Sequence, residues 1–128
     1  MKMQDLIDAA KRQKWEFVDT HLAEVCNDSS NIEWAVGVGL DDLDGNVRDL
    51  AASLLERADI QPSAFEQMRS RLHSVMTRDS HPYARYRSAL ALAAHGPGSY
   101  REEVMRVLGE ASTDPDVSDL AKAYLSKL

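Results

Sequence analysis

The sequence predicts an all-helical protein in which about four antiparallel helix pairs pack in a row as an α-solenoid. Three observations predict this fold. A helix-capping motif, S-x-x-E, recurs at Ser30, Ser63 and Ser99, at intervals of 33 and 36 residues. A turn motif recurs between these positions, and apolar residues follow each turn at helical spacing. The predicted helix pairs span residues 3–27, 30–58, 63–95 and 99–127, within a single domain of residues 1–128.

The first predicted pair, residues 3–27, has a weaker apolar pattern than the others. One helix would present Met3, Leu6, Ile7 and Ala10, and the other Val18, Leu22, Val25 and Cys26. Lys14 and Trp15 stand near the corner between the two helices. These residues predict a degenerate first unit.

In the second predicted pair, residues 30–58, the first helix has an interrupted stripe of apolar residues and the second helix has a regular one. Gly37 and Gly39 interrupt the first stripe, whose apolar members are Ile32, Ala35, Val36 and Leu40. A glycine inside a helix costs about 1 kcal/mol relative to alanine, so these glycines predict either close helix packing or a weak helix. A turn over residues 42–48 then opens a helix with a continuous stripe at Val47, Leu50, Ala51, Leu54 and Leu55.

The third and fourth pairs, residues 63–95 and 99–127, repeat this plan. Pro82 and Pro115 take the place of Gly45 in the turns, and proline is well accommodated in the first turn of a helix. The first helices carry stripes at Phe65, Met68, Leu72, Val75 and Met76, and at Val104, Val107, Leu108 and Ala111. The second helices carry stripes at Tyr86, Ala89, Leu90 and Ala93, and at Val117, Leu120, Ala121, Tyr124 and Leu125.

The turn motif, D-x-x-[P/G]-x-[V/A]-R followed by an alanine- and leucine-rich stripe, resembles the second half of a HEAT repeat. It is most similar to the short PBS-lyase HEAT-like repeats, and the resemblance covers residues 30–128. The resemblance implies a HEAT-like superhelix with a ladder of charged pairs between neighbouring repeats, formed from Asp42, Asp44, Arg48, Asp79 and Arg85. Two positions depart from the pattern. Ser118 stands where arginine is expected and Arg87 replaces a leucine, so we expect the ladder to weaken at the last repeat.

Charge is distributed unevenly along a chain whose net charge is −6. Residues 1–62 carry 6 basic and 13 acidic side chains, residues 63–95 carry 5 and 2, and residues 96–128 carry 4 and 6. The middle third is therefore basic. Such a run is most often a solvated helix face, but arginine beside tyrosine can also bind a carboxylate, a phosphate or a stacked base.

The sequence contains no residue pattern typical of an enzyme or a metal centre. Cys26, the only cysteine, falls on an apolar helix face, where cysteine acts as a small hydrophobe. Carboxylates such as Asp114 and Asp116 stand at predicted helix starts, where the helix dipole favours negative charge. His81, beside Pro82, is predicted to be solvated or to cap a helix. We expect no catalytic residue, no metal and no cofactor.

These observations favour a non-catalytic binding scaffold that uses the concave face of stacked helix pairs for protein–protein interaction. The expected partner-binding residues are Arg48, Arg78, His81, Tyr83, Arg85, Arg87 and Lys122, with Ala52 and Ala89 exposed beside them. One alternative is nucleic-acid or anion binding through the basic third repeat, which a similarity to HEAT-like DNA glycosylases would imply. A second alternative, implied by the PBS-lyase resemblance, is a bilin-lyase-like enzyme subunit.

The expected location and partners follow from what the sequence lacks. No apolar run is long enough to span a membrane, and the N-terminal residues have no apolar segment of a secretory signal. We therefore expect a cytoplasmic protein whose partner is another protein, with nucleic acid less favoured and no membrane contact. Leu125 and Leu128 in the last helix could contact a second copy, which leaves self-association open.

Overall fold

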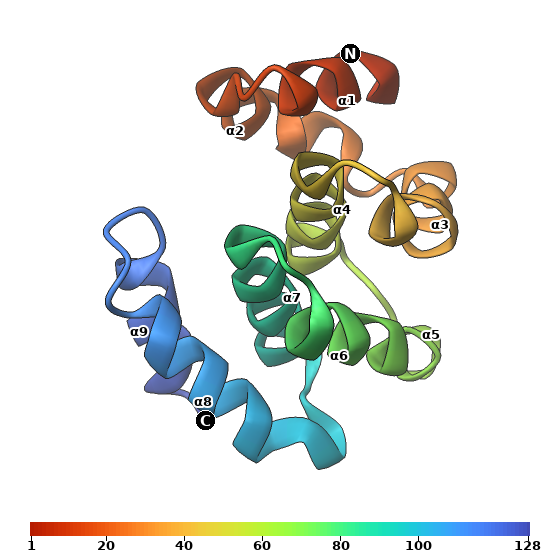
Figure 1. Cartoon of the computed structure of the whole chain (residues 1–128). Helices are drawn as coiled ribbons and strands as arrows, with labels where there is room; N and C mark the ends of the chain where they lie inside the picture. The colour runs from red at the N-terminus through yellow and green to blue at the C-terminus, as the bar shows by residue number, and fades with distance from the viewer.

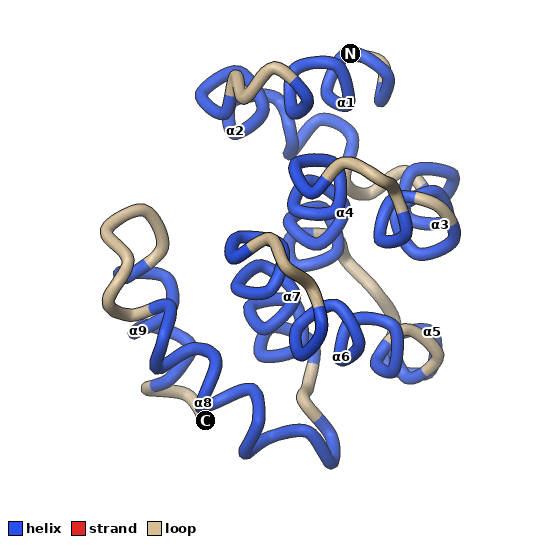
Figure 2. Tube along the Cα trace, viewed as in Figure 1, coloured by secondary structure: helices blue, strands red, loops and turns tan.

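The computed structural model describes all 128 residues and is entirely helical, without a strand (Figures 1 and 2). The α-helices are α1 (Met3–Lys11), α2 (Trp15–Val25), α3 (Ser29–Gly37), α4 (Gly45–Arg57), α5 (Pro62–Glu66), α6 (Arg69–Arg78), α7 (Pro82–His95), α8 (Arg101–Ala111) and α9 (Ser118–Leu125). Two short 3₁₀ helices, η1 (Gly39–Asp41) and η2 (Gly98–Tyr100), lie between them. The prediction of an all-α fold is confirmed. None of the helices combines the length and the apolar character needed to cross a membrane.

Helices α4 and α7 lie side by side in the middle of the molecule and make its most extensive helix–helix contact (Figure 1). Helices α3 and α6 pack on one side of them, and α8 and α9 pack along the other side of α7. The α1–α2 hairpin crosses the end of α4 near the N-terminus (Figure 1). Each predicted pair thus contains two helices in contact, and the other helices pack around the central helices α4 and α7.

Small residues allow the central helices to approach closely. Ala51 and Ala52 of α4 and Ala89 and Ala91 of α7 are fully buried in one hydrophobic cluster that reaches every hairpin. The prediction that Ala52 and Ala89 are exposed is wrong, because the alanine face of each helix is the face that packs on its neighbour. Gly39 also marks a close approach, since a Cβ there would lie 2.8 Å from the Cβ of Ala51.

The structure corrects the predicted helix starts at the three serines. None of Ser30, Ser63 and Ser99 caps a helix with its side chain. The Asp28 carboxylate accepts from the Ser30 N–H and begins α3 earlier, and Pro62 occupies the first turn of α5. Ser99 lies inside η2, and α8 starts beyond it. A nearby carboxylate, a proline or a 3₁₀ turn therefore takes the place of each predicted serine cap.

The aspartate turns, in contrast, recur as the sequence predicts. The carboxylates of Asp42, Asp79 and Asp114 each accept a hydrogen bond from the backbone N–H two residues later, at 2.8, 2.8 and 2.9 Å. Pro82 then occupies the first turn of α7. Pro115 does not open α9, which begins at Ser118 after further turn residues. The last hairpin therefore has the predicted turn but a delayed second helix.

Two predicted first helices are shorter than their apolar stripes. Helix α3 ends at Gly37, and Leu40 of the same stripe lies on η1. The stripe over Phe65–Met76 is divided between α5 and α6, because the N–H groups of Gln67 and Met68 bond carbonyls three residues back. Apolar spacing therefore identified the buried faces but not the breaks within them.

Candidate functional site

The turns of the second and third hairpins are joined by a bidentate ion pair. Arg48 on α4 donates from Nε and Nη2 to the two carboxylate oxygens of Asp79, at 2.6 and 2.9 Å. Its Nη1 also donates to the Asp42 carbonyl at 2.7 Å. Burial favours the neutral form of Asp79, but the hydrogen bonds from Arg48 and from the His81 N–H outweigh it and lower the pKa of the carboxyl. Arg48 is thus fully engaged in holding two turns together.

The turns of the third and fourth hairpins are joined differently. Arg85 donates to Glu110 at 3.1 Å and to the Met76 carbonyl, and does not bond Asp114. The Tyr83 hydroxyl instead lies 2.9 Å from an Asp114 oxygen and 3.0 Å from an Asp116 oxygen. Burial and the two carboxylates raise the pKa of Tyr83. The arginine–aspartate pair that a regular ladder would place here is absent, and we expected the ladder to weaken at this last repeat.

Three of the five arginines of the basic middle third are paired with acids of neighbouring hairpins: Arg71 with Asp41, Arg85 with Glu110 and Arg87 with Asp49. The His73 ring also lies within hydrogen-bond distance of Glu103. His81 caps α7, since its Nδ1 accepts from the Ala84 N–H at 3.2 Å. Arg78 at the end of α6 and Lys122 on α9 are exposed. Basic side chains of the third hairpin therefore form ion pairs with acidic side chains of the second and fourth hairpins.

A cavity of about 310 Å³ opens on the face of α4 and α7 that is turned toward α2 and the α8–α9 turn; we call this the inner face. Four separate segments line it: Trp15, Val18 and Asp19 from α2, Asp49 and Ser53 from α4, Tyr83 and Arg87 from α7, and Asp116 from the α8–α9 turn. Each of these four segments belongs to a different hairpin, so the cavity forms only when the hairpins pack together.

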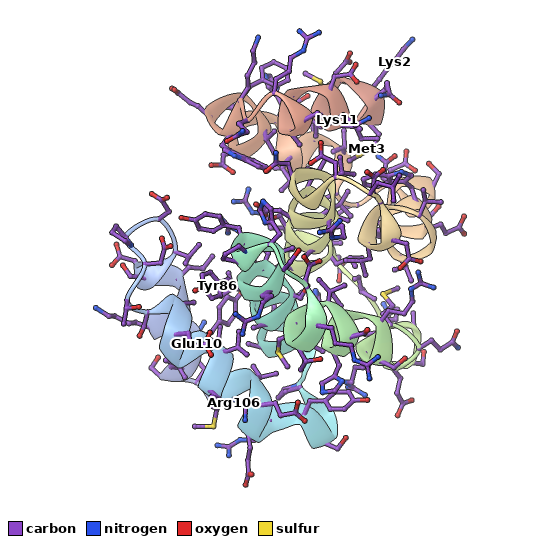
Figure 3. All side chains as sticks on the ribbon, in the orientation of Figure 1. Lys2, Met3, Lys11, Tyr86, Arg106 and Glu110 are labelled. Carbon is purple, nitrogen blue, oxygen red and sulfur yellow. The ribbon has the colours of Figure 1, made fainter.

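The last hairpin closes one side of the inner face. The Tyr124 hydroxyl of α9 donates to Glu56 of α4 at 3.1 Å, across 68 positions of sequence. Burial and the Glu56 carboxylate raise the pKa of Tyr124 to about 12. Figure 3 places Tyr86 between α7 and this hairpin, on the side where Glu110 lies, and its ring meets that of Tyr83 edge-on at 6.0 Å. Aromatic side chains of α7 and α9 thus hold the hairpin against the centre.

Asp49 forms the floor of the inner-face cavity and is only 6% exposed. Ser53 Oγ donates to one Asp49 oxygen at 3.3 Å, and Arg87 Nε lies 3.7 Å from the same oxygen, beyond ordinary hydrogen-bond length. Burial raises the pKa of Asp49 to about 6, and the Arg87 charge opposes this shift. A buried carboxyl with a perturbed pKa, beside a loosely held guanidinium in a cavity, is typical of a functional site.

A second hollow, of about 570 Å³, lies over the α1–α2 corner. All of its lining comes from residues 13–21, and it includes the exposed ring of Phe17 beside His21. Side chains from one short segment do not converge on a ligand from several sides, as those of the inner-face cavity do. The inner-face cavity is therefore the candidate site.

The sequence identified only part of this site. Of the seven predicted partner-binding residues, Tyr83 and Arg87 meet in the cavity, while Arg48, Arg85 and His81 are engaged between hairpins. Sequence reasoning missed Trp15, Asp19, Asp49 and Asp116. One available signal was the polar pair Asp49–Ser53, four residues apart on a helix otherwise rich in alanine and leucine, which places both side chains on one helix face.

Comparisons of this chain with protein-family models, with curated proteins and with solved structures found no match. No group of three or more histidine, cysteine, aspartate or glutamate side chains is arranged to hold a metal ion. The chemistry of the cavity is therefore inferred from its own residues: three carboxylates, one guanidinium, two hydroxyls and two large aromatic rings.

Proposed function

We propose that the protein is a non-catalytic binding scaffold whose inner face holds a segment of another protein. The observation that carries the proposal is the inner-face cavity, to which four separate segments contribute aromatic and charged side chains. A concave site with a few converging polar groups is the usual place for a ligand. An extended peptide segment can place one side chain in such a cavity while its backbone follows the inner face.

The proposal includes a HEAT-like arrangement of the hairpins. The close pairing of α4 with α7, the recurring aspartate turns and the Arg48–Asp79 pair support it, because repeat proteins join each unit to the next through equivalent contacts. In such an arrangement the second helices, α4, α7 and α9, line the concave side. Asp49, Tyr83 and Arg87, which line the inner-face cavity, would then belong to the concave side.

Charge favours a protein segment over nucleic acid as the partner. The cations that made the middle third a candidate for phosphate binding are largely paired with carboxylates. The cavity lining itself contains three aspartates and a single arginine. Nucleic-acid affinity depends on unpaired basic side chains that displace counterions from phosphates. An acidic cavity in a chain of net charge −6 opposes that mode of binding.

The test is selection of peptides by the full chain from a displayed library of random linear peptides, followed by calorimetric titration of the enriched sequences. Ser53→Leu should abolish binding, because the larger side chain projects into the cavity from a buried position. Thr77→Leu, on the exposed side of α6, is the matched control and should bind as the unchanged chain does. Thermal unfolding of both variants verifies that they fold.

Two results would contradict the proposal. One is a library that yields no binder, and the other is a binder that Ser53→Leu leaves unaffected. Salt-sensitive binding of duplex DNA that Ser53→Leu abolishes would favour the nucleic-acid alternative instead.

A further inference from the structure

The charges that line the inner-face cavity do not balance. Asp19, Asp49 and Asp116 stand against the single cation Arg87. Arg87 lies beside Asp49 at 3.7 Å, which leaves the carboxylates of Asp19 and Asp116 without a cationic partner. An anion entering the cavity would face two uncompensated negative charges. A cation would be attracted by both, more strongly than in open solvent because the site is partly enclosed.

The two rim aspartates have free hydrogen-bond capacity. The Asp19 side chain accepts no hydrogen bond from the protein, and Asp116 accepts one at Oδ2, from Tyr83. They come from α2 and from the α8–α9 turn, so they approach the cavity from different segments. A planar guanidinium has five N–H donors in a fixed fork and suits such carboxylates better than a spherical ammonium does.

Aromatic rings complete the lining. Trp15 belongs to the same wall as Asp19, and Tyr83 belongs to the same wall as Arg87. The face of an aromatic ring attracts a cation, most strongly for tryptophan, and guanidinium groups use this attraction more often than ammonium groups. The volume of about 310 Å³ is at the lower end for ligand cavities, which suits one side chain and not a large ligand.

We propose that the inner-face cavity receives the guanidinium of one arginine side chain from the partner segment, between the carboxylates of Asp19 and Asp116 and against the Trp15 ring. This inference rests on the proposed function, since it names the chemistry of the segment that the inner face binds. The selected peptides should therefore share one arginine. The partner is a basic segment, complementary to the negative net charge of this chain.

The binding should strengthen as the pH rises from 5 to 7. Asp49 gains its charge in this range, because burial raises its pKa to about 6. The charged and polar groups that act on it are Arg87 from α7, His81 at the N-cap of α7, Ser53 on its own helix and Asp19 from α2. Once Asp49 is ionised, its charge opposes that of Arg87, which weakens the repulsion between Arg87 and an incoming guanidinium.

The experiment compares four peptides that differ at one position, with arginine, lysine, citrulline or glutamate between serine and glycine residues. Each is titrated into the full chain and followed by NMR shifts of backbone amides. The arginine peptide should bind at least about tenfold more tightly than the citrulline peptide, which has the same shape without the charge. Asp19→Asn and Asp116→Asn should each weaken the arginine peptide by about tenfold, whereas Asp119→Asn, exposed on α9 and outside the cavity, should not.

Each outcome has a distinct meaning. If citrulline equals arginine, or if the glutamate peptide binds best, the guanidinium assignment is wrong. The proposed function then still stands, provided that library-selected peptides lose binding in Ser53→Leu. If a single-stranded oligonucleotide shifts the same amides more strongly than any peptide, the partner class is wrong. If neither these peptides nor the library gives a binder, the proposed function fails as well.

Discussion

The two junctions that flank the third hairpin differ in how they use the same turn motif. Between the second and third hairpins, the partly buried Arg48 forms two hydrogen bonds with Asp79, and the side chains of the two residues are only 18% and 5% exposed. Between the third and fourth hairpins, Arg85 turns to the half-exposed Glu110, and a tyrosine contacts the aspartates of the turn. The first junction is joined by a bidentate ion pair, whereas the second borders the inner-face cavity.

The difference follows from a small change in the last hairpin. Helix α9 begins at Ser118, beyond the proline where the repeat would start it, so additional turn residues lie ahead of the helix. Asp114 and Asp116 then face Tyr83 at the edge of the inner face. A regular junction buries its charged groups in mutual contacts. The irregular junction leaves Asp116 without a cationic partner at the edge of the inner-face cavity.

The largest expected effect distinguishes the two junctions directly. Arg48→Ala removes one partner of a partly buried, bidentate pair and leaves the Asp79 carboxylate without its cation, so the free energy of unfolding should fall by about 3 kcal/mol. Arg85→Ala removes a more exposed pair and should cost about 1 kcal/mol or less. Urea unfolding of both variants measures the difference, with the exposed Arg78→Ala as the control. Equal losses for Arg48→Ala and Arg85→Ala would remove the distinction between the junctions.

The pH dependence of stability should show opposite contributions from the two buried aspartates. The folded pKa of Asp49 is raised to about 6 from 3.8, so its contribution is complete below about pH 4 and is lost as the pH rises to 6. The loss is at most about 3 kcal/mol. The folded pKa of Asp79 is lowered, so its contribution is present above the unfolded pKa and is lost as the pH falls below it.

Urea unfolding at pH values between 3 and 7, at constant ionic strength, separates these contributions. Asp49→Asn should remove the decline in stability between pH 4 and 6. Asp79→Asn should remove part of the loss on the acid side and lower the stability at neutral pH. An Asp49→Asn variant that retains the full decline between pH 4 and 6 would show that another group causes it.

Gly45, at the junction of the second and third hairpins, should not tolerate a side chain. A Cβ added at Gly45 would lie 2.4 to 2.9 Å from atoms of the His81 side chain, which is held in place as the cap of α7. We expect Gly45→Ala to lower the free energy of unfolding by about 2 kcal/mol through this overpacking. The measurement is again urea unfolding. A neutral result would mean that His81 moves without loss of its capping hydrogen bond, and NMR of the imidazole would reveal that movement.

The sequence predicted α4 and α7 better than the first helices of their hairpins. The turn motif followed by an apolar stripe identified both helices, although each is buried at more positions than its stripe contains. The serine caps were wrong because a carboxylate or proline nearby competes for the same backbone positions, and a local motif does not reveal which one prevails.

The cavity was harder to predict because it depends on distances between hairpins. Tyr83 and Arg87 were identified from a local basic and aromatic run, yet Trp15 and Asp116 reach the same place from positions 101 residues apart in the sequence. Asp49 gave no apolar signal, because it is a polar residue among the buried positions of α4. Pattern reasoning identifies which face of a helix is buried, but not which faces of distant helices meet.

The smallest expected effect comes from a glycine in the last hairpin. Gly109 lies within α8, and a Cβ there would meet nothing within 4 Å. Gly109→Ala should therefore raise the free energy of unfolding by about 0.5–1 kcal/mol, because alanine loses less backbone entropy in a helix and here meets no neighbour. If the last hairpin folds together with the rest, this gain appears in the global urea transition. If hydrogen exchange shows the gain only in amides of α8 and α9, the last hairpin opens separately from the central helices.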